Sequence, residues 1–314
     1  MTIRTTTIFP TISKKTAHIA ALLSFFACMA TTTVSASSDV NKDIEATHIA
    51  LASSEDHYFW NGFNFADTTK QASVKAEKKF RKFAKQTKKM HPADAAKQIN
   101  CLVNAIFDNK DERKLQNCAK TFTDIAEQTM GNSKSKQYDL VSYELFRETL
   151  ASIQYAHIAS RYGNTAMAKS VLKNMPGTHI DNVTCMGRQG DTTILSSMSA
   201  QYTVLFFYDP DCHVCHDIAK QLASQDIMTN DSDIAVVAIY PDIDTKRWLA
   251  HPQAFPSNWK DMCSVNGEIA EKELFHLPIL PAIYLLDSNN FVILKDCKPD
   301  TLISVLHQLK TRKY

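Results

Sequence analysis

The sequence predicts an all-helical domain followed by an α/β domain in which a mixed sheet is flanked by helices. Three observations support this fold class. The 314 residues suit about two domains of ordinary size. Apolar residues recur at helical spacing between residues 71 and 174, and after Met175-Pro176-Gly177 strand-like apolar runs alternate with helical segments. With 44% hydrophobic and 22% charged residues, the composition is that of a globular protein rather than a disordered or collagen-like chain.

Residues 1–36 have the pattern of a cleaved signal peptide. Basic residues without acidic ones come first, Ala17–Ala30 is an apolar stretch, and Val34-Ser35-Ala36 offers small residues at a cleavage-like position. The apolar stretch is shorter than the ~20 residues that a membrane-spanning helix needs. We therefore expect an exported, periplasmic protein whose mature chain has no transmembrane segment.

Cys28 offers a second interpretation of this segment, because it follows Phe25-Phe26-Ala27 and could be a poor lipoprotein attachment site. A cysteine inside a discarded leader is the simpler interpretation. Loss of the leader would change the formal net charge from +2 to about −1, since three of the 35 basic residues lie in it and all 33 acidic residues lie outside it. So small a charge predicts no nucleic-acid partner.

A polar linker is predicted over residues 37–56 and a helical domain over residues 57–175. This domain opens with the aromatic sequence HYFWNGFNFAD, residues 57–67, which could line a ligand site. We expect it instead to anchor the chain onto the helical core. The apolar residues that then recur at helical spacing are Ile99, Leu102, Val103 and Ile106, then Leu115, Phe122 and Ile125, then Tyr143, Phe146, Leu150 and Ile153.

The first predicted helix is strongly basic. Its cationic residues are Lys70, Lys75, Lys78, Lys79, Arg81, Lys82, Lys85, Lys88 and Lys89. A basic amphipathic helix could contact an anionic membrane or an acidic partner, but we expect a solvated face.

Cys101 and Cys118 lie at nearly equal distances from a turn predicted at residues 108–111, so an antiparallel helix pair would bring them level. The periodicity argues against a disulfide, because Cys101 falls opposite the apolar face of its helix while Cys118 shares the face of Leu115 and Phe122. The sequence leaves this pairing open.

The α/β domain is predicted over residues 178–314. Its expected elements are strand Tyr202–Tyr208, a helix from Cys212 to about Ser224, strand Ile234–Tyr240, helices near Thr245–Ala250 and Ile269–Phe275, strand Ala282–Leu286, a turn at residues 287–290, strand Phe291–Lys295 and helix Thr301–Leu309. Alternating strands and helices followed by a hairpin predict a mixed sheet.

Cys212-His213-Val214-Cys215 lies where a strand ends and a helix is expected to begin. At a helix N-terminus, unpaired backbone N–H groups and the helix dipole stabilise a thiolate and can lower a cysteine pKa from about 8.5 to ~3.5–7.5. Cys215 lies one helical turn further, close enough for a disulfide. The pattern predicts Cys212 as a nucleophile and Cys215 as the resolving thiol.

A second motif, Leu277-Pro278-Ile279-Leu280-Pro281, stands just before a predicted strand. An X-Pro bond can be cis, and Pro281 lacks an N–H, so it could face the disulfide without donating to sulfur. We expect Pro281 to shape a substrate groove.

In its order of elements and motifs, the segment from about Thr178 to Lys310 resembles the thioredoxin-like domain of exported thiol–disulfide oxidoreductases of the TlpA and ResA type. The sequence HYFWNGFNFADTT resembles the opening of a helical domain of unknown function that precedes such domains in exported bacterial proteins. The resemblance implies Cys212 and Cys215 as the catalytic pair, Pro281 as the cis-proline, and Leu280 as offering its backbone to an extended protein or peptide substrate. It implies no cofactor or metal, and an unidentified redox donor as a further partner.

The chain departs from many relatives of this type. Asp211 replaces a tryptophan before the first cysteine, His213 and Val214 replace Gly-Pro or Gly-His, and Phe206 stands where thioredoxins have a buried acid. A His213 imidazolium would favour the Cys212 thiolate, whereas Asp209 and Asp211 would oppose it. We therefore expect His213 and Val214 to tune the pair, with the ranking of the charges undecided.

Other interpretations of these residues remain. Cys212-His213-Val214-Cys215-His216 also spells the C-x-x-C-H haem attachment signature, and a thioredoxin-like fold can serve as a scaffold for binding without catalysis. A single CxxC is weak evidence for zinc. Of the remaining cysteines, Cys263 could be a third redox thiol at a strand end, and Cys185 and Cys297 are expected to be small core residues.

Overall fold

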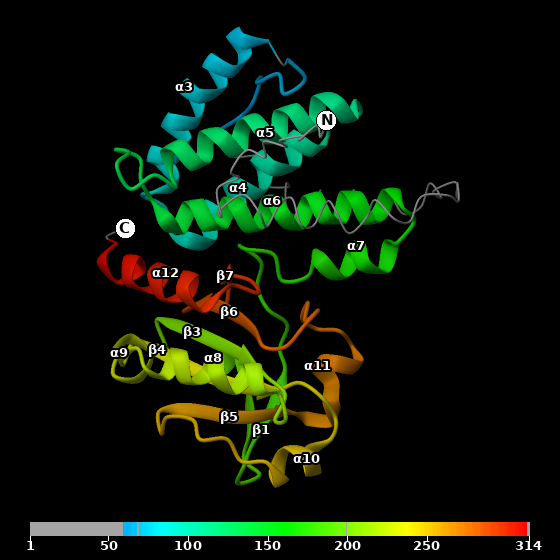
Figure 1. Ribbon diagram of the computed structural model, residues 1–314, viewed down its shortest axis with the longest axis vertical. Helices are drawn as coiled ribbons and strands as arrows, with labels where there is room; N and C mark the ends of the chain where they lie inside the picture. Colours follow the sequence, from blue (N-terminus) through cyan, green and yellow to red (C-terminus); the bar gives the residue numbers. More distant parts are fainter. Residues whose placement is uncertain (1–58, 68, 199, 313–314) are drawn as a thin grey trace, which may run out of the picture. The chain divides into compact units, whose positions relative to one another are not determined.

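The computed structural model describes residues 59–67, 69–198 and 200–312, all of which belong to one compact unit (Figure 1). The predicted leader, the lipoprotein alternative at Cys28 and the linker lie outside the described residues. Within the described part of the chain, no helix is long and apolar enough to cross a membrane.

In the described part of the chain, five helices precede the sheet. They are α3 (Lys70–Thr87), α4 (Pro92–Phe107), α5 (Glu112–Thr129), α6 (Leu140–Arg161) and α7 (Thr165–Val171). Side chains cap the starts of three of them: Thr69 accepts from the Ala72 amide, Asp111 caps α5, and Asn164 caps α7. Pro92 occupies the first position of α4, where its missing N–H costs no hydrogen bond.

The aromatic opening segment packs onto the helical core, as predicted. Trp60 is 1% exposed, and its ring meets those of Phe63, Phe83 and Phe122 at centroid distances of 5.3–5.6 Å. Burial of large aromatic side chains contributes strongly to core stability, so this segment ties the chain entry to α3 and α5.

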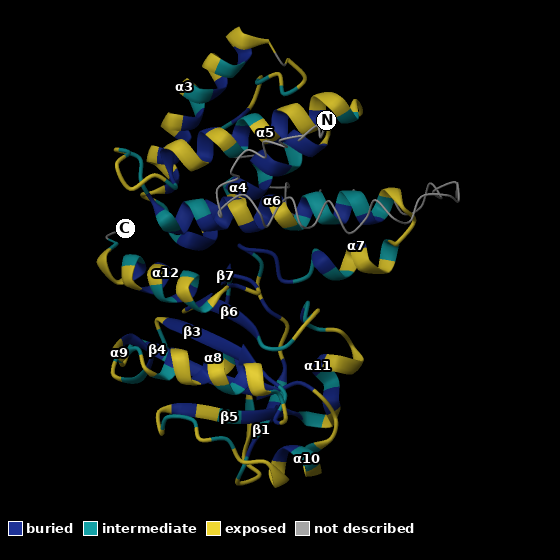
Figure 2. Ribbon diagram, viewed as in Figure 1, coloured by how far each residue is buried: buried dark blue, intermediate teal, exposed yellow. Residues whose placement is uncertain are grey.

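The α/β half contains a seven-stranded mixed sheet with the strand order β2-β1-β5-β4-β3-β6-β7. The strands are β1 (Thr184–Gly187), β2 (Thr192–Ile194), β3 (Tyr202–Phe207), β4 (Ile234–Tyr240), β5 (Trp259–Ser264), β6 (Ala282–Asp287) and β7 (Val292–Leu294). The central strands β3, β4 and β5 are parallel, and the flanking pairs are antiparallel. Figure 2 shows β3 and β6 buried throughout.

The sheet buries both faces because alternate side chains enter different hydrophobic clusters. Val204 and Phe206 pack in the cluster that contains residues of α8 (His213–Ala223) and α12 (Pro299–Thr311), whereas Leu205 and Phe207 pack in the cluster that contains Ile269 of α11 (Glu268–Glu271). Short helices α9 (Asp226–Thr229) and α10 (Thr245–Ala250) complete the connections. A strand covered on both faces reads as a continuous apolar run, which β3 and β4 show.

Two features of this half differ from the sequence predictions. Strands β1, β2 and β5 were not among the predicted elements, because β1 and β2 are short and all three carry polar residues. The helix expected over Ile269–Phe275 ends at Glu271, since Glu273 takes a left-handed backbone with φ of 46° and Leu274 turns back to donate to the Ile269 carbonyl.

The two halves of the described chain share one hydrophobic cluster. Helices α4 and α6 contact β7, and α6 also contacts α12. Polar bonds cross the same boundary: the Asn100 side chain donates to the Pro176 carbonyl at 2.9 Å, and the Val141 amide donates to the Gln308 side chain at 2.9 Å. The division at residue 175 stays a sequence prediction.

Candidate active site

The candidate site lies at the edge of the sheet where β3, β4 and β5 end. Because these strands are parallel, their carboxyl ends meet there, and binding sites in such sheets form at this edge. Antiparallel β6 starts at the same edge, since Ala282 pairs with Phe207 at the end of β3. Cys212, which follows β3, and Pro281, which precedes β6, are thus brought to one end of the sheet.

Cys212 and Cys215 form a disulfide with a Cα–Cα distance of 5.2 Å. Cys212 is the N-cap of α8 and half-buried, whereas Cys215 is 1% exposed and packs in the core. The two sulfurs therefore differ in access: the first faces the protein surface and the second lies beneath it.

The helix start also supplies a hydrogen bond to sulfur. The Cys215 amide donates to the Cys212 sulfur at 3.1 Å, as an N-cap side chain receives an amide from the first turn. In the reduced state this N–H and the helix dipole would stabilise a Cys212 thiolate. A thiolate at a reachable position with a second thiol behind it can carry out disulfide exchange.

The Leu280–Pro281 peptide bond is cis, as the sequence predicted was possible. Leu280 is half-buried and packs against both hydrophobic clusters, while the preceding Ile279 is 77% exposed. On the other side of the edge, Val214 is 60% exposed in the first turn of α8. Apolar side chains therefore stand on two elements of the edge that holds the disulfide.

The two histidines of the motif, His213 and His216, have different surroundings. His213 is exposed, whereas the His216 Nε2 lies 2.9 Å from the Pro210 carbonyl oxygen. Because a carbonyl can only accept, His216 donates through Nε2. Haem attachment through this motif, which needs two thioether bonds and an axial histidine, stays an alternative from the sequence.

Arg247 on α10 binds the two acidic residues, Asp209 and Asp211, that precede Cys212. Its guanidinium donates to Asp209 at 2.8 Å and to Asp211 at 2.6–2.7 Å. These hydrogen bonds and the positive charge lower the pKa of Asp211. Sequence reasoning did not find this contact, because 36 positions separate Arg247 from Asp211 and no local motif marks it.

An open groove of about 490 Å³ lies between the residues that flank Cys212 in sequence and the segment that follows α10. Its lining residues include Pro210, Asp211, His213, His216, His251 and Gln253. Across residues 59–67, 69–198 and 200–312, no group of three histidine, cysteine or carboxylate side chains is placed to hold a metal ion.

The other cysteines lie in the core or in the helical half. Cys263 sits at the end of β5, on the active edge, but it is fully buried and burial raises its pKa. Burial likewise raises the pKa of Cys185 to about 12 and that of Cys297 well above its usual value. Cys118 is buried in α5, and no disulfide joins it to Cys101. Buried thiols of raised pKa are poor nucleophiles.

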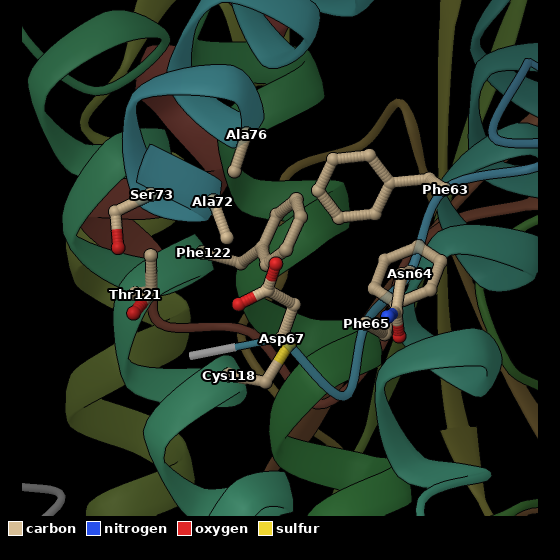
Figure 3. Close-up of a pocket in the computed structure, with 10 residues that line it drawn as sticks. All are labelled: Phe63, Asn64, Phe65, Asp67, Ala72, Ser73, Ala76, Cys118, Thr121 and Phe122. Atoms are coloured by element: carbon tan, nitrogen blue, oxygen red, sulfur yellow. The ribbon is translucent and has the colours of Figure 1, made fainter. Parts of the chain in front are cut away.

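A second, much smaller cavity lies in the helical half (Figure 3). The rings of Phe63, Phe65 and Phe122 and the thiol of Cys118 line it, and its volume is about 20 Å³. A cavity of this size holds about one water molecule, so the aromatic segment does not form a ligand site here.

The strand order and the disulfide at the start of α8, with Pro281 at the same end of the sheet, are those of a thioredoxin-like fold. The chain has this fold in its α/β half. No protein-family model and no curated protein matches it.

Solved structures from Bacteroides are similar to this chain. A conserved protein of unknown function from Bacteroides fragilis is 35% identical, covers 42% of this chain and is itself 98% covered, with a TM-score of 0.40. A thioredoxin-like protein from Bacteroides caccae is 22% identical over 98% of this chain and 99% of its own, with a TM-score of 0.45. A thiol–disulfide oxidoreductase from Bacteroides fragilis is 19% identical, covering 42% of this chain and 99% of its own, with a TM-score of 0.36.

Proposed function

We propose that this protein is an exported thiol–disulfide oxidoreductase that exchanges disulfides with protein or peptide substrates through Cys212 and Cys215. The observation that carries the proposal is the pair itself: a half-buried N-cap cysteine that receives an amide hydrogen bond, joined to a buried cysteine one turn below. The thioredoxin-like fold, and the position of the cysteine pair at the end of the sheet where β3 ends and β6 begins, support the same activity.

In the reducing direction, the Cys212 thiolate attacks a substrate disulfide. A mixed disulfide forms, and one substrate sulfur leaves as a thiolate that takes up a proton. Cys215 then loses its proton and attacks the Cys212 sulfur, which releases the second substrate thiolate and leaves the Cys212–Cys215 disulfide. Two electrons pass to the substrate, and a separate dithiol donor must return them.

We propose that Leu280 and Pro281 hold the substrate. Extended peptides bind exposed sheet backbone as an added strand, and Leu280 lies where β6 starts beside the disulfide. Val214 and Ile279, both largely exposed, offer apolar contact to the residues that flank a substrate cysteine. His213 lies in the same first turn, where its charge would act on the thiolate.

The leader sequence supports export, and an oxidising compartment lets a surface disulfide persist. We infer a periplasmic location for the mature chain, with lipid attachment at Cys28 as the alternative. N-terminal sequencing of the mature protein distinguishes cleavage near Ala36 from processing at Cys28.

Reduction of insulin by dithiothreitol-recycled protein tests the activity. Cys212→Ala should abolish turnover, and Cys215→Ala should accumulate mixed disulfides, because the resolving thiol is lost. Cys263→Ala, at the same edge but buried, is the matched control and should retain turnover. Turnover by the Cys212→Ala variant would exclude the mechanism. An intact pair that glutathione can neither oxidise nor reduce would support a scaffold role instead.

A further inference from the structure

The loop that delivers Cys212 carries two negative charges. Asp209 and Asp211 both precede the nucleophile, and the Cys212 amide donates to the Asp209 carbonyl at 3.1 Å. The Asp211 amide donates to the Asp209 carboxylate at 2.9 Å, which draws the two acids into one tight turn. Like charges beside a thiol disfavour its ionisation, so this loop by itself opposes the proposed chemistry.

Arg247 is the cation placed on these acids. It is the third residue of α10, and its backbone amide is held by the Asp244 cap at 3.0 Å. From there the guanidinium contacts Asp209 and Asp211 together. A planar guanidinium with several donors suits two carboxylates better than a lysine ammonium does. About a third of the Arg247 side chain is exposed, so water screens the ion pair only in part.

Other ionisable groups also surround this loop: Tyr240 acts on Arg247, Asp242 follows close to Tyr240, Arg188 donates to the Trp248 and His251 carbonyls, and three histidines lie nearby. His213 and His216 are on α8, and His251 Nδ1 lies 3.7 Å from the other Asp211 oxygen. The segment Leu277–Pro281 on the opposite side contains no ionisable residue. Arg247 is the permanently charged cation that contacts Asp209 and Asp211, whereas the histidines carry charge only when protonated.

We propose that Arg247 is a positioning residue of the redox site: through its ion pairs with Asp209 and Asp211, it offsets the charge of the two carboxylates that precede Cys212. This inference rests on the proposed function, since it assigns Arg247 a role in the reactivity of the same pair. It explains how a chain with acids in front of its nucleophile can still present a reactive thiolate.

The test is the titration of the Cys212 thiolate in the full mature chain, followed by absorbance at 240 nm and by the pH dependence of alkylation. Arg247→Gln should raise the pKa of Cys212 by about half to one pH unit, because it uncovers the two carboxylates at near-surface dielectric. The alkylation rate at about pH 6 should fall roughly two- to fivefold, because less of the thiol is ionised and the greater nucleophilicity of a more basic thiolate offsets only part of that loss.

Lys246→Gln is the matched control, because it removes the same charge from the adjacent, exposed position of α10. It should leave the Cys212 pKa unchanged. The double variant Asp211→Asn with Arg247→Gln should recover most of the wild-type pKa, since it removes one charge of each sign. Arg247→Lys should raise the pKa of Cys212 less than Arg247→Gln does, because lysine keeps the positive charge. Circular dichroism of each variant confirms that it is folded.

Two results would overturn the proposal. One is a Cys212 pKa that does not change in Arg247→Gln. The other is a rise that persists in the double variant, because the effect would then come from loop displacement and not from charge. Thiolate titration needs no substrate turnover, so a failure of Arg247 to act is distinguishable from a failure of the proposed oxidoreductase activity, which insulin reduction measures.

Discussion

The Glu148 carboxylate on α6 accepts a hydrogen bond of 2.9 Å from the backbone amide of Lys295, just after β7. The Lys295 ammonium donates to the carbonyl oxygens of Val171 and, at 2.7 Å, of Lys173, both at the end of the helical half. Both titratable side chains are buried. These buried hydrogen bonds join α6, the end of β7 and the segment that ends α7. They hold these elements in place only while each buried polar group keeps its hydrogen-bond partner.

Replacing Glu148 should destabilise the protein in a way that depends on the replacement. Glu148→Ala leaves the Lys295 amide buried without an acceptor, at a cost of about 1–3 kcal/mol in the free energy of unfolding. Glu148→Gln keeps an acceptor and should cost less. Urea denaturation at neutral pH measures both. Equal losses for the two variants would contradict a hydrogen-bond role for this side chain.

The same residue should make stability depend on pH. Burial raises the pKa of Glu148 to about 8, so the folded state holds a proton that the unfolded chain has lost above its usual carboxyl pKa. The contribution of Glu148 is therefore fully present in acid and is lost as the pH rises toward 8. The stability of Glu148→Gln relative to wild type should increase between about pH 5 and 8. Thermal unfolding across this range checks the sign, and a flat difference would refute it.

His276 should have the opposite dependence. Its Nδ1 lies 3.0 Å from the Ser170 hydroxyl of α7, and burial lowers its pKa to about 4. Between the ordinary histidine pKa and pH 4, His276 is protonated in the unfolded chain but not in the folded protein. Its contribution to the free energy of unfolding is therefore fully present above the ordinary histidine pKa and is lost as the pH falls toward 4. His276→Gln should reduce the acid sensitivity of unfolding between about pH 6.5 and 4. His251→Gln, which replaces an exposed histidine at the end of α10, is the control and should leave the acid sensitivity of unfolding unchanged.

The apolar edge predicts a selective effect on substrate binding. Ile279→Ser or Val214→Ser should raise KM for a peptide disulfide with apolar flanks by roughly two- to tenfold while kcat changes little, because each removes apolar contact made in the complex. Ile194→Ser on β2, with 48% exposure, is the control for loss of a surface isoleucine. A loss of kcat with unchanged KM would show that these side chains do not act through binding.

Trp60 should be the strongest single stability determinant of the aromatic segment. Trp60→Ala should lower the free energy of unfolding by about 3–5 kcal/mol, since a fully buried aromatic side chain leaves a large cavity. Phe59→Ala, from the neighbouring half-buried ring, should cost less. Denaturant unfolding measures both. The thiolate pKa of Cys212 in folded Trp60→Ala should stay at the wild-type value.

Much of this protein could be predicted from local signals. The change from helical to strand periodicity after Met175 marked two kinds of structure, and β4 and α10 occupy the predicted ranges. Cys212 at a helix start and Pro281 before a strand are also local patterns, because caps and X-Pro bonds depend on neighbouring residues. Short strands such as β1 and β2 carried too little periodicity to be recognised.

The sequence by itself determined the closeness of Cys212 and Cys215, the place of Pro281 before a strand and the helical module in front, since each rests on residues a few positions apart. Only the tertiary structure decided the charge around Cys212: Arg247 reaches Asp211 across 36 positions through a fold that brings α10 to the end of β3. It also decided which groups are buried, as Glu148 and His276 show. Coulomb energy and desolvation depend on distance in space and on exposure, and neither quantity can be read from spacing along the chain.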